Sequence, residues 1–241
     1  MKKLLKSLIK KILKKNNWKL EKIVQPRDYN LKAPEEVMLS KIRNSKGILH
    51  VGAHRGSEAP VYEWFGKKVL WFEANPFIFK DLEDNIFKYK HQFVYNELLL
   101  DEKKKNIEFF LSNNDFASSS IFNFGKLSEG KDSLWPEKKL KMVKSIYLNS
   151  KSFDELILEK KLDIENYNHW VIDTQGSELL FLKGAKNSLK YCKSIYVEVS
   201  NADVYKNGSE WIDVKNYLTS FGFEQITELN SEHADVLFVK N

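Results

Sequence analysis

The chain has 241 residues, 42% of them hydrophobic and 13% aromatic, which suits one domain of ordinary size with a substantial core. Its single cysteine, Cys192, excludes an intramolecular disulfide and a thiolate-rich metal site. The five histidines have no metal-binding spacing and predict no metal site, while the acids Asp173 and Glu198 leave the use of a metal open. The net charge of +6 is concentrated in the first nineteen residues, which carry eight lysines and no acid. The remainder is close to neutral, which argues against a nucleic-acid partner.

Residues 1–24 form a distinct segment in which leucines and isoleucines fall on one half of a helical wheel and most lysines on the other. This pattern predicts a basic amphipathic helix, and the lysines interrupt it too often for a signal peptide or a membrane span. Such a helix can lie on an anionic membrane surface, pack on the body of the protein, or pack on the partner subunit of a homodimer. We therefore expect a cytoplasmic protein, with peripheral contact at the inner face of the membrane as one alternative.

Residues 25–33 are predicted to be a linker, and a short helix over 34–43 leads into the first strand. An N-terminal region, 1–44, thus precedes the main domain, 45–241. The main domain begins with an apolar strand that ends in a turn containing Gly52 and Gly56, followed by a helix over 57–65. Such glycines let the backbone turn tightly and approach a ligand closely.

This turn differs from two common nucleotide-binding motifs. No lysine follows Gly56, so the turn is not a phosphate-binding P-loop. Position 54 is His54, so the dinucleotide pattern Gly-x-Gly-x-x-Gly is also missing. The turn alone therefore does not identify its ligand.

A second strand, 68–72, ends in Glu73-Ala74-Asn75-Pro76, and a helix over 77–89 follows. Glu73 comes about twenty residues after Gly52, where dinucleotide-binding folds keep the acid that binds the ribose. The alternative is an ordinary carboxylate at the end of a strand.

The middle of the chain has weaker patterns. A third strand is predicted at 92–99, a hairpin turn at 103–106 and a strand outside the parallel sheet at 107–111. The polar, irregular residues 112–144 are either a lid or binding loop, or a surface insertion with no role. A short strand at 145–148 and a helix over 153–159, capped by Ser152, come next.

The second informative stretch is an apolar strand that ends in Asp173-Thr174-Gln175-Gly176, before a helix over 177–189. Alternation of strands and helices predicts a parallel sheet with helices on both faces, which binds ligands at the carboxyl ends of its strands. The remaining elements are a strand at 194–199, a helix over 210–221, and closing strands at 223–227 and 235–239. Five features are thereby placed at strand ends: Gly52, Glu73, Asn96, Asp173 and Glu198.

Together these stretches resemble the FkbM family of S-adenosylmethionine-dependent methyltransferases. The most specific piece is Val171-Ile172-Asp173-Thr174-Gln175-Gly176-Ser177-Glu178-Leu179, followed by Leu182-Lys183-Gly184-Ala185. The other matching pieces are residues 48–56, 71–76, 118–120 and 196–199. The resemblance covers roughly residues 45 to 240.

The resemblance implies a Rossmann-like, seven-stranded class I methyltransferase fold that binds S-adenosylmethionine. It places Glu73 on the ribose, the residues after the third strand beside the adenine, and the turn at 173–176 near the methionine end and the acceptor. Many methyltransferases of this fold have an acid where this chain has His50, so a backbone carbonyl would replace that contact. The cofactor-binding residues implied are His50, Gly52, Ala53, Gly56, Glu73, Ala74, Asn75, Asn96, Leu98, Asp101 and Gln175.

Family members commonly O-methylate sugars or other small hydroxylated metabolites, so the resemblance implies a sugar, glycan or small-metabolite acceptor. Removal of the hydroxyl proton calls for a base. The candidate bases are Asp173 first, then His54 and Glu198. His233 is a further candidate, for which we expect a structural or exposed position. Glu178 begins a helix, where the helix dipole alone favours a carboxylate.

Two other functions stay open at this point. One is an NAD(P)-dependent oxidoreductase on the same sheet topology, which the missing glycine pattern argues against. The other is a non-catalytic module that binds the cofactor without turnover.

Overall fold

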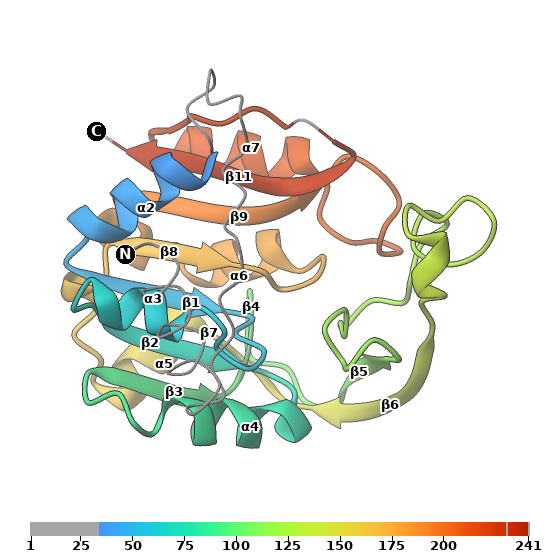
Figure 1. The fold of residues 1–241 in the computed structure, drawn as a ribbon, viewed down its shortest axis with the longest axis horizontal. Coiled ribbons are helices and arrows are strands. Elements are labelled where there is room, and N and C mark those ends of the chain that lie inside the picture. The colour runs from blue at the N-terminus through green and yellow to red at the C-terminus, as the bar shows by residue number, and fades with distance from the viewer. Residues whose placement is uncertain (1–33, 230, 241) are drawn as a thin grey trace, which may run out of the picture. The chain divides into compact units, whose positions relative to one another are not determined.

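The computed structural model describes residues 34–229 and 231–240 (Figure 1). The predicted amphipathic helix over 1–24 and the linker over 25–33 lie outside the described residues. Among the described residues, no helix is both long enough and apolar enough to span a bilayer.

The described part of the chain is built on a seven-stranded sheet in the order β10-β11-β9-β8-β1-β2-β3. Its parallel strands are β1 (Gly47–Val51), β2 (Lys68–Glu73), β3 (Gln92–Asn96), β8 (His169–Ile172) and β9 (Ser194–Ser200). β11 (His233–Lys240) is antiparallel to β9 and to β10 (Phe223–Gln225). This mostly parallel arrangement confirms the predicted fold class.

The central strands are buried on both faces, which explains their continuous apolar runs. Every residue of β1 and of β8 is buried, as expected for parallel strands covered on both sides. The chain adds β2 and β3 on one side of β1, and then returns to add β8 on its other side. Open α/β sheets form their ligand crevice at such a reversal, outside the carboxyl ends of the strands.

In the described part of the chain, three helices cover each face of the sheet. The core on one face contains residues of α2 (Pro34–Asn44), α3 (Ala59–Trp64) and α4 (Pro76–Ile86). The core on the other face contains residues of α5 (Phe153–Lys160), α6 (Glu178–Gly184) and α7 (Trp211–Ser220). The compact unit begins at Pro34, so α2 packs with the sheet. The predicted Ser152 cap is confirmed, because Ser152 and Glu155 form a capping box at the start of α5.

Two predictions between residues 92 and 111 are wrong. The strand predicted at 92–99 is divided into β3 and the separate β4 (Leu98–Leu100), which pairs with β7 (Ser150–Ser152). The hairpin predicted at 103–106 does not form, because β5 (Ile107–Ser112) pairs with the distant β6 (Met142–Leu148) instead of with β4. β5 does lie outside the main sheet, as predicted.

The helix predicted over 177–189 ends early, at Gly184. A Cβ at Gly184 would overlap the carbonyl oxygen of Leu100, so glycine lets β4 lie against α6. A separate 3-10 turn, η3 (Ser188–Tyr191), follows. The described residues also form the 3-10 turns η1 (Pro136–Lys138) and η2 (Ile164–Asn166).

Residues 113–141, between β5 and β6, form an insertion beside the edge of the sheet where the arrowheads of β1, β2, β3 and β8 lie (Figure 1). The insertion has a small core of its own, in which Phe124 and Leu140 pack with Val204 and Tyr205. The backbone N–H of Gly125 donates to the Val204 carbonyl oxygen at 2.8 Å. The polar segment is therefore an ordered wall over the carboxyl ends of the strands.

Candidate active site

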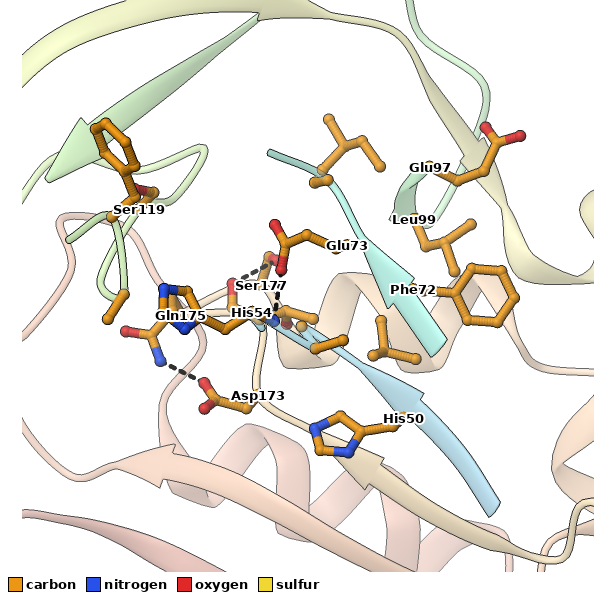
Figure 2. A pocket seen from close by; sticks show the side chains of 18 of the residues that line it. His50, His54, Phe72, Glu73, Glu97, Leu99, Ser119, Asp173, Gln175 and Ser177 are labelled. Carbon is orange, nitrogen blue, oxygen red and sulfur yellow. Dashed lines mark hydrogen bonds between the residues drawn. The ribbon is translucent and has the colours of Figure 1, made fainter. Parts of the chain in front are cut away.

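Two cavities meet at the carboxyl ends of β1 and β8, and both are lined by Ala117, Asp173 and Gln175. The first has a volume of about 270 Å³ and extends from Asp173 past the glycine turn to the residues after β3. Figure 2 shows Glu73 and His54 in this cavity, with Gln175 hydrogen-bonded to Asp173. The second has a volume of about 330 Å³ and extends from Asp173 and Glu198 to the insertion.

Gly52 brings the end of β1 against the end of β8. Its φ is +82°, and a Cβ there would overlap the carbonyl oxygen of Asp173. The N–H groups of Gly52 and Ala53 both donate to the carbonyl oxygen of Phe72, at 2.9 and 3.0 Å. This glycine therefore serves close packing of two strand ends, and its N–H is already used within the protein.

Gly56 does not line the cavity. Its φ is +68°, and a Cβ there would press on the side chains of Leu82 and Ile86 of α4. The second glycine of the turn thus lets α4 pack against the turn.

Glu73 lies at the end of β2 with both carboxylate oxygens facing backbone donors. Oε2 accepts from the N–H of His54 at 2.8 Å, and Oε1 accepts from the N–H of Asn75 at 2.7 Å. The side chain lines the first cavity and is only 9% exposed. Burial raises the pKa of Glu73 to about 7, although the two N–H groups oppose that shift. A carboxylate has about four lone-pair positions, so Glu73 retains capacity to accept from a ligand.

His50 lies at the base of the first cavity and is 5% exposed. Its ring stacks on Trp71 at 4.7 Å between centroids, and Nδ1 shares a hydrogen bond with the Tyr62 hydroxyl at 3.1 Å. Burial lowers the pKa of His50 to about 4, so the ring is neutral at pH 7. The predicted cofactor-binding residue His50 is therefore a neutral imidazole in the lining of the first cavity.

The residues that follow β2 and β3 divide into those that line the first cavity and those that support it. Ala74, Glu97, Leu98 and Leu99 line it. Three others that were predicted lie outside the lining. Asn75 caps α4 by accepting from the N–H of Phe77, and Asn96 donates through Nδ2 to the Glu73 carbonyl oxygen at 2.8 Å. Asp101 lies near Lys104, with Oδ1 and Nζ 3.7 Å apart.

The start of the insertion covers the first cavity. Phe116, Ala117 and Ser119 line it, and Arg55 of the glycine turn binds Asp115 through Nη1 and Nη2. The His54 ring also reaches this segment, with Nε2 3.0 Å from the Asp115 carbonyl oxygen. His54 therefore lines the cavity and contacts its cover.

The three consecutive serines of the insertion connect the two cavities. Ser118 lines the second cavity and Ser119 lines the first. The Ser120 hydroxyl donates to the Gln175 carbonyl oxygen at 2.7 Å. The motif fixes the insertion to the turn after β8.

Asp173 and Glu198 form a carboxyl pair where the cavities meet, and Gln175 bridges it. The Gln175 amide donates through Nε2 to Asp173 Oδ1 and, at 2.7 Å, to Glu198 Oε2. Its Oε1 accepts from the Tyr205 hydroxyl, which sets the orientation of the amide. Gln175 has a φ of +53°, a left-handed conformation that is uncommon for a residue other than glycine.

Desolvation raises the pKa of both carboxyl groups of this pair. The pKa of Asp173 is raised well above its usual range, by burial first and by the Glu198 charge second. The pKa of Glu198 is raised to about 8, by burial first and by the charge of Glu178 second. The raised pKa values favour the protonated form of both carboxyls, so the pair ionises only as the pH rises towards about 8.

His233 extends this pair toward the insertion. Its Nε2 is 3.0 Å from Glu198 Oε1, and its Nδ1 is 2.8 Å from the Ser200 hydroxyl. The Trp135 ring meets the His233 ring edge to face, with centroids 5.2 Å apart. Both side chains line the second cavity.

Glu178 lines neither cavity. Its Oε1 accepts from the N–H groups of Thr174 and Gly176, both at 3.0 Å. It therefore holds the turn that presents Asp173 and Gln175.

Sequence reasoning missed Tyr205 and Trp135, which follow no recognisable motif and reach the site through tertiary packing. Leu99 lies in the predicted strand 92–99 and Ser119 in the matching piece 118–120. The sequence therefore pointed to both segments, although it did not single out these two residues. Among the described residues, no group of three or more His, Cys, Asp or Glu side chains is arranged to hold a metal ion.

This sheet order, with an antiparallel strand at its C-terminal end and a site at the reversal, defines a class I methyltransferase fold. A model of the family described as "Methyltransferase FkbM domain" matches residues 50–224. The chain therefore belongs to the FkbM methyltransferase family, and it is an enzyme that uses S-adenosylmethionine. The predicted family is confirmed.

Solved structures similar to the chain include other methyltransferases. One is an S-adenosylmethionine-dependent methyltransferase from Aquifex aeolicus, with 10% identity, a TM-score of 0.46, and coverage of 86% of this chain and 88% of that one. Another is precorrin-6y C5,15-methyltransferase from Geobacter metallireducens, with 10% identity, a TM-score of 0.46, and coverage of 92% and 95%. A search of curated proteins finds no significant match.

The residues of the first cavity fit this cofactor. The buried Glu73 carboxylate has free lone pairs for hydroxyl donors, and apolar side chains of Leu98, Leu99 and Phe109 line the same cavity. The cavity ends at Asp173, where the second cavity begins. A ligand with a polar ribose and a flat base thus finds both kinds of surface.

Proposed function

We propose that the chain transfers a methyl group from S-adenosylmethionine to a hydroxyl group of a sugar or glycan. The observation that carries this proposal is the junction of two cavities at the carboxyl pair Asp173–Glu198. One cavity suits the donor and the other is open to an acceptor. A base at the junction is what methylation of a hydroxyl requires.

In this proposal Glu73 accepts hydrogen bonds from the ribose hydroxyls, and Ala74, Leu98 and Leu99 border the adenine. Gly52, Ala53 and His50 form the floor of the cavity, while Gly56, Asn75 and Asn96 hold its walls in place. When bound, the cofactor supplies an electrophilic methyl group. Asp101 lies outside the lining and has no place in the proposed site.

Asp173 is the proposed base, because it alone of the two acids lines both cavities. The acceptor hydroxyl loses its proton to the Asp173 carboxylate as its oxygen takes up the methyl group. Gln175 Nε2 donates to both carboxyls and so holds Glu198 beside Asp173. His233, on the far side of Glu198, stabilises the negative charge of the pair.

A sugar acceptor is favoured by the composition of the second cavity. Aromatic rings of Phe124, Trp135 and Tyr205 line it together with Asn114, Ser118 and Ser128. Sugars present apolar C–H faces and a rim of hydroxyls, so aromatic and hydrogen-bonding groups in one cavity match both.

The test combines donor binding and turnover. Calorimetry should show that S-adenosylhomocysteine binds, and a panel of saccharides should then yield methylated products with the donor. The variant Asp173→Asn should lose about 10²–10⁴-fold in turnover while it retains donor binding. Asp235→Asn is the control, because Asp235 is an exposed acid on β11 that lines neither cavity. Equal loss in both variants would contradict the role of Asp173.

Turnover should also depend on pH. Because the pKa of Glu198 is raised to about 8 by burial, the pair has a free carboxylate only as the pH approaches that value. The rate constant for methyl transfer should rise with pH through about 8. A pH-independent rate between 6 and 9 would argue against a carboxyl base.

Residues 1–24 support a second proposal, about location. Their basic, amphipathic sequence favours contact with an anionic membrane surface, near which glycans are assembled. Sedimentation with anionic and neutral vesicles, for the full chain and for a chain that lacks residues 1–24, tests this. Equal binding by both chains would remove the membrane proposal. A homodimer stays a prediction.

A further inference from the structure

A third cavity continues the second one away from Asp173. It has a volume of about 290 Å³ and lies entirely within residues 128–141 of the insertion. Three residues, Ser128, Trp135 and Leu140, line both the second and the third cavity. The three cavities thus follow one another from the donor cavity, past the carboxyl pair and Trp135, to the outer end of the insertion.

The wall between the second and third cavities is anchored at several points. The N–H of Trp135 donates to the Ser133 hydroxyl oxygen at 3.1 Å, and the Ser133 hydroxyl donates to the Ser128 carbonyl oxygen at 2.9 Å. The buried Ser128 hydroxyl donates in turn to the Val204 carbonyl oxygen at 2.7 Å. Trp135 is therefore held at a set position between the two cavities.

The far side of the third cavity is also tied down. Lys141 exchanges hydrogen bonds with Asn113, its N–H to Asn113 Oδ1 at 2.9 Å and its carbonyl oxygen from the Asn113 N–H at 3.0 Å. The Asn113 amide also donates to the Lys139 carbonyl oxygen at 3.0 Å. Hydrogen bonds thus fix the backbone of the insertion on both sides of the third cavity.

The lining of the third cavity resembles that of the second in its chemistry. A tryptophan ring and the apolar Leu140 and Pro136 lie beside hydroxyl groups, and Lys139, Lys141 and Glu129 add charged donors and acceptors. Cationic groups beside an aromatic ring suit a polyhydroxylated ring, and they suit one that bears a carboxylate best.

We infer that the third cavity is a second saccharide subsite, so that the acceptor is a glycan of at least two sugar units, with the methylated unit at Asp173 and the next unit beyond Trp135. This inference rests on the proposed function and deepens it. Binding energy from the outer unit would act on the reacting unit, because remote contacts help to hold the hydroxyl in position. The enzyme would therefore act on a sugar that is already joined to another.

The experiment measures S-adenosylhomocysteine release with matched series of mono-, di- and trisaccharides, neutral and uronic, prepared as methyl glycosides. We expect the disaccharides to exceed the monosaccharides in kcat/KM by about tenfold or more, with little further gain for trisaccharides. The variant Lys141→Trp, which fills the third cavity, should lower the ratio of disaccharide to monosaccharide kcat/KM by about the same factor. Lys144→Trp on β6 is the control, because Lys144 lines none of the three cavities.

The outcomes separate this inference from the proposed function. Methylation of monosaccharides as efficient as that of disaccharides would overturn the second subsite and leave the proposed function in place. A ratio that Lys141→Trp and Lys144→Trp change equally would overturn the subsite as well. Binding of S-adenosylhomocysteine with no methylation of any saccharide would overturn both proposals about the acceptor.

Discussion

At the scale of single residues, Gly52 is the position where the site tolerates least change. A side chain there would meet main-chain atoms of Asp173, and its φ of +82° is unfavourable for other residues. Backbone atoms of two strand ends cannot move aside without moving the carboxyl pair. The glycine is thus required by the protein's own packing, whatever ligand the cavity binds.

We predict that Gly52→Ala lowers the free energy of unfolding by more than about 3 kcal/mol, or prevents folding. Gly66→Ala is the matched control, since Gly66 also has a positive φ, of +62°, but nothing lies within 4 Å of its added Cβ. That control should cost about 1–2 kcal/mol. Urea denaturation followed by circular dichroism measures both, and equal losses would contradict the packing argument.

Glu73 should make donor binding depend on pH. Burial raises the pKa of Glu73 to about 7, and ribose hydroxyls bind best to the ionised carboxylate. The affinity for S-adenosylhomocysteine should therefore increase as the pH rises through about 7, with proton release on binding below it. Calorimetry in buffers of different ionisation enthalpy measures this.

The variant Glu73→Gln should remove that pH dependence and weaken binding by about 1–3 kcal/mol, the cost of a lost hydrogen bond to a charged group. Glu97→Gln serves as a comparison, because Glu97 lines the same cavity without contacting the glycine turn. An affinity that remains equally pH-dependent in Glu73→Gln would assign the titration to another group.

At the scale of elements, the site depends on how the insertion between β5 and β6 is attached to the sheet. Arg55 connects it to the glycine turn, Ser120 connects it to the turn after β8, and Gly125 lies against Asp203 in the segment after β9. Each attachment starts from a different strand end. The irregular segment is therefore part of the binding surface.

Removal of the contact between Arg55 and Asp115 should loosen the start of the insertion, which covers the donor cavity. Asp115→Ala should weaken S-adenosylhomocysteine binding by about two- to fivefold, which is the range expected for an exposed ion pair. Asp81→Ala is the matched control, because Asp81 also binds Arg55, at 2.9 Å, but belongs to α4 and not to the insertion. The effect should decrease at high salt, and a larger effect in the control would contradict this role of the insertion.

At the scale of the whole molecule, four carboxyl groups lie close to the carboxyl ends of the strands, and burial keeps them partly protonated. Burial raises the pKa of Glu73 and of Glu178 to about 7, that of Glu198 to about 8, and that of Asp173 well above its usual range. In the unfolded chain all four would be ionised above pH 6. The folded chain therefore binds more protons between pH 6.5 and 8.

Stability should consequently decrease as the pH rises through that window, by about 1.4 kcal/mol per pH unit for each proton that only the folded chain retains. Burial lowers the pKa of His50 to about 4 and that of His169 to about 3, so both are neutral in the folded chain throughout this window. In the unfolded chain they lose their protons around pH 6.5, so they oppose the decrease only at the lower end of the window. Urea denaturation at pH 6.5, 7.25 and 8 measures the slope.

Glu198→Gln should flatten the upper part of that slope, since it removes a carboxyl whose pKa is about 8. Glu224→Gln, an exposed acid on β10, is the control. A stability that increases with pH in the unmodified chain would contradict the raised pKa values.

The sequence by itself determined the sheet, the family and the places where the site begins. Strand, turn and helix follow from local periodicity and turn chemistry, so Gly52, Glu73 and Asp173 could be placed at strand ends from neighbouring residues alone. The predictions were wrong for strands whose pairing partner lies far along the chain, as with β4 and β7 or β5 and β6. No local pattern specifies such a partner.

Only the tertiary structure decided which residues meet. Gly52 contacts Asp173, Gln175 joins the two acids and Tyr205 orients it, because long loops pack across the edge of the sheet. The same packing gave the polar insertion its cavities and set Trp135 beside His233. Contacts between distant segments depend on shape and packing in three dimensions, and the one-dimensional pattern of residue types does not carry that information.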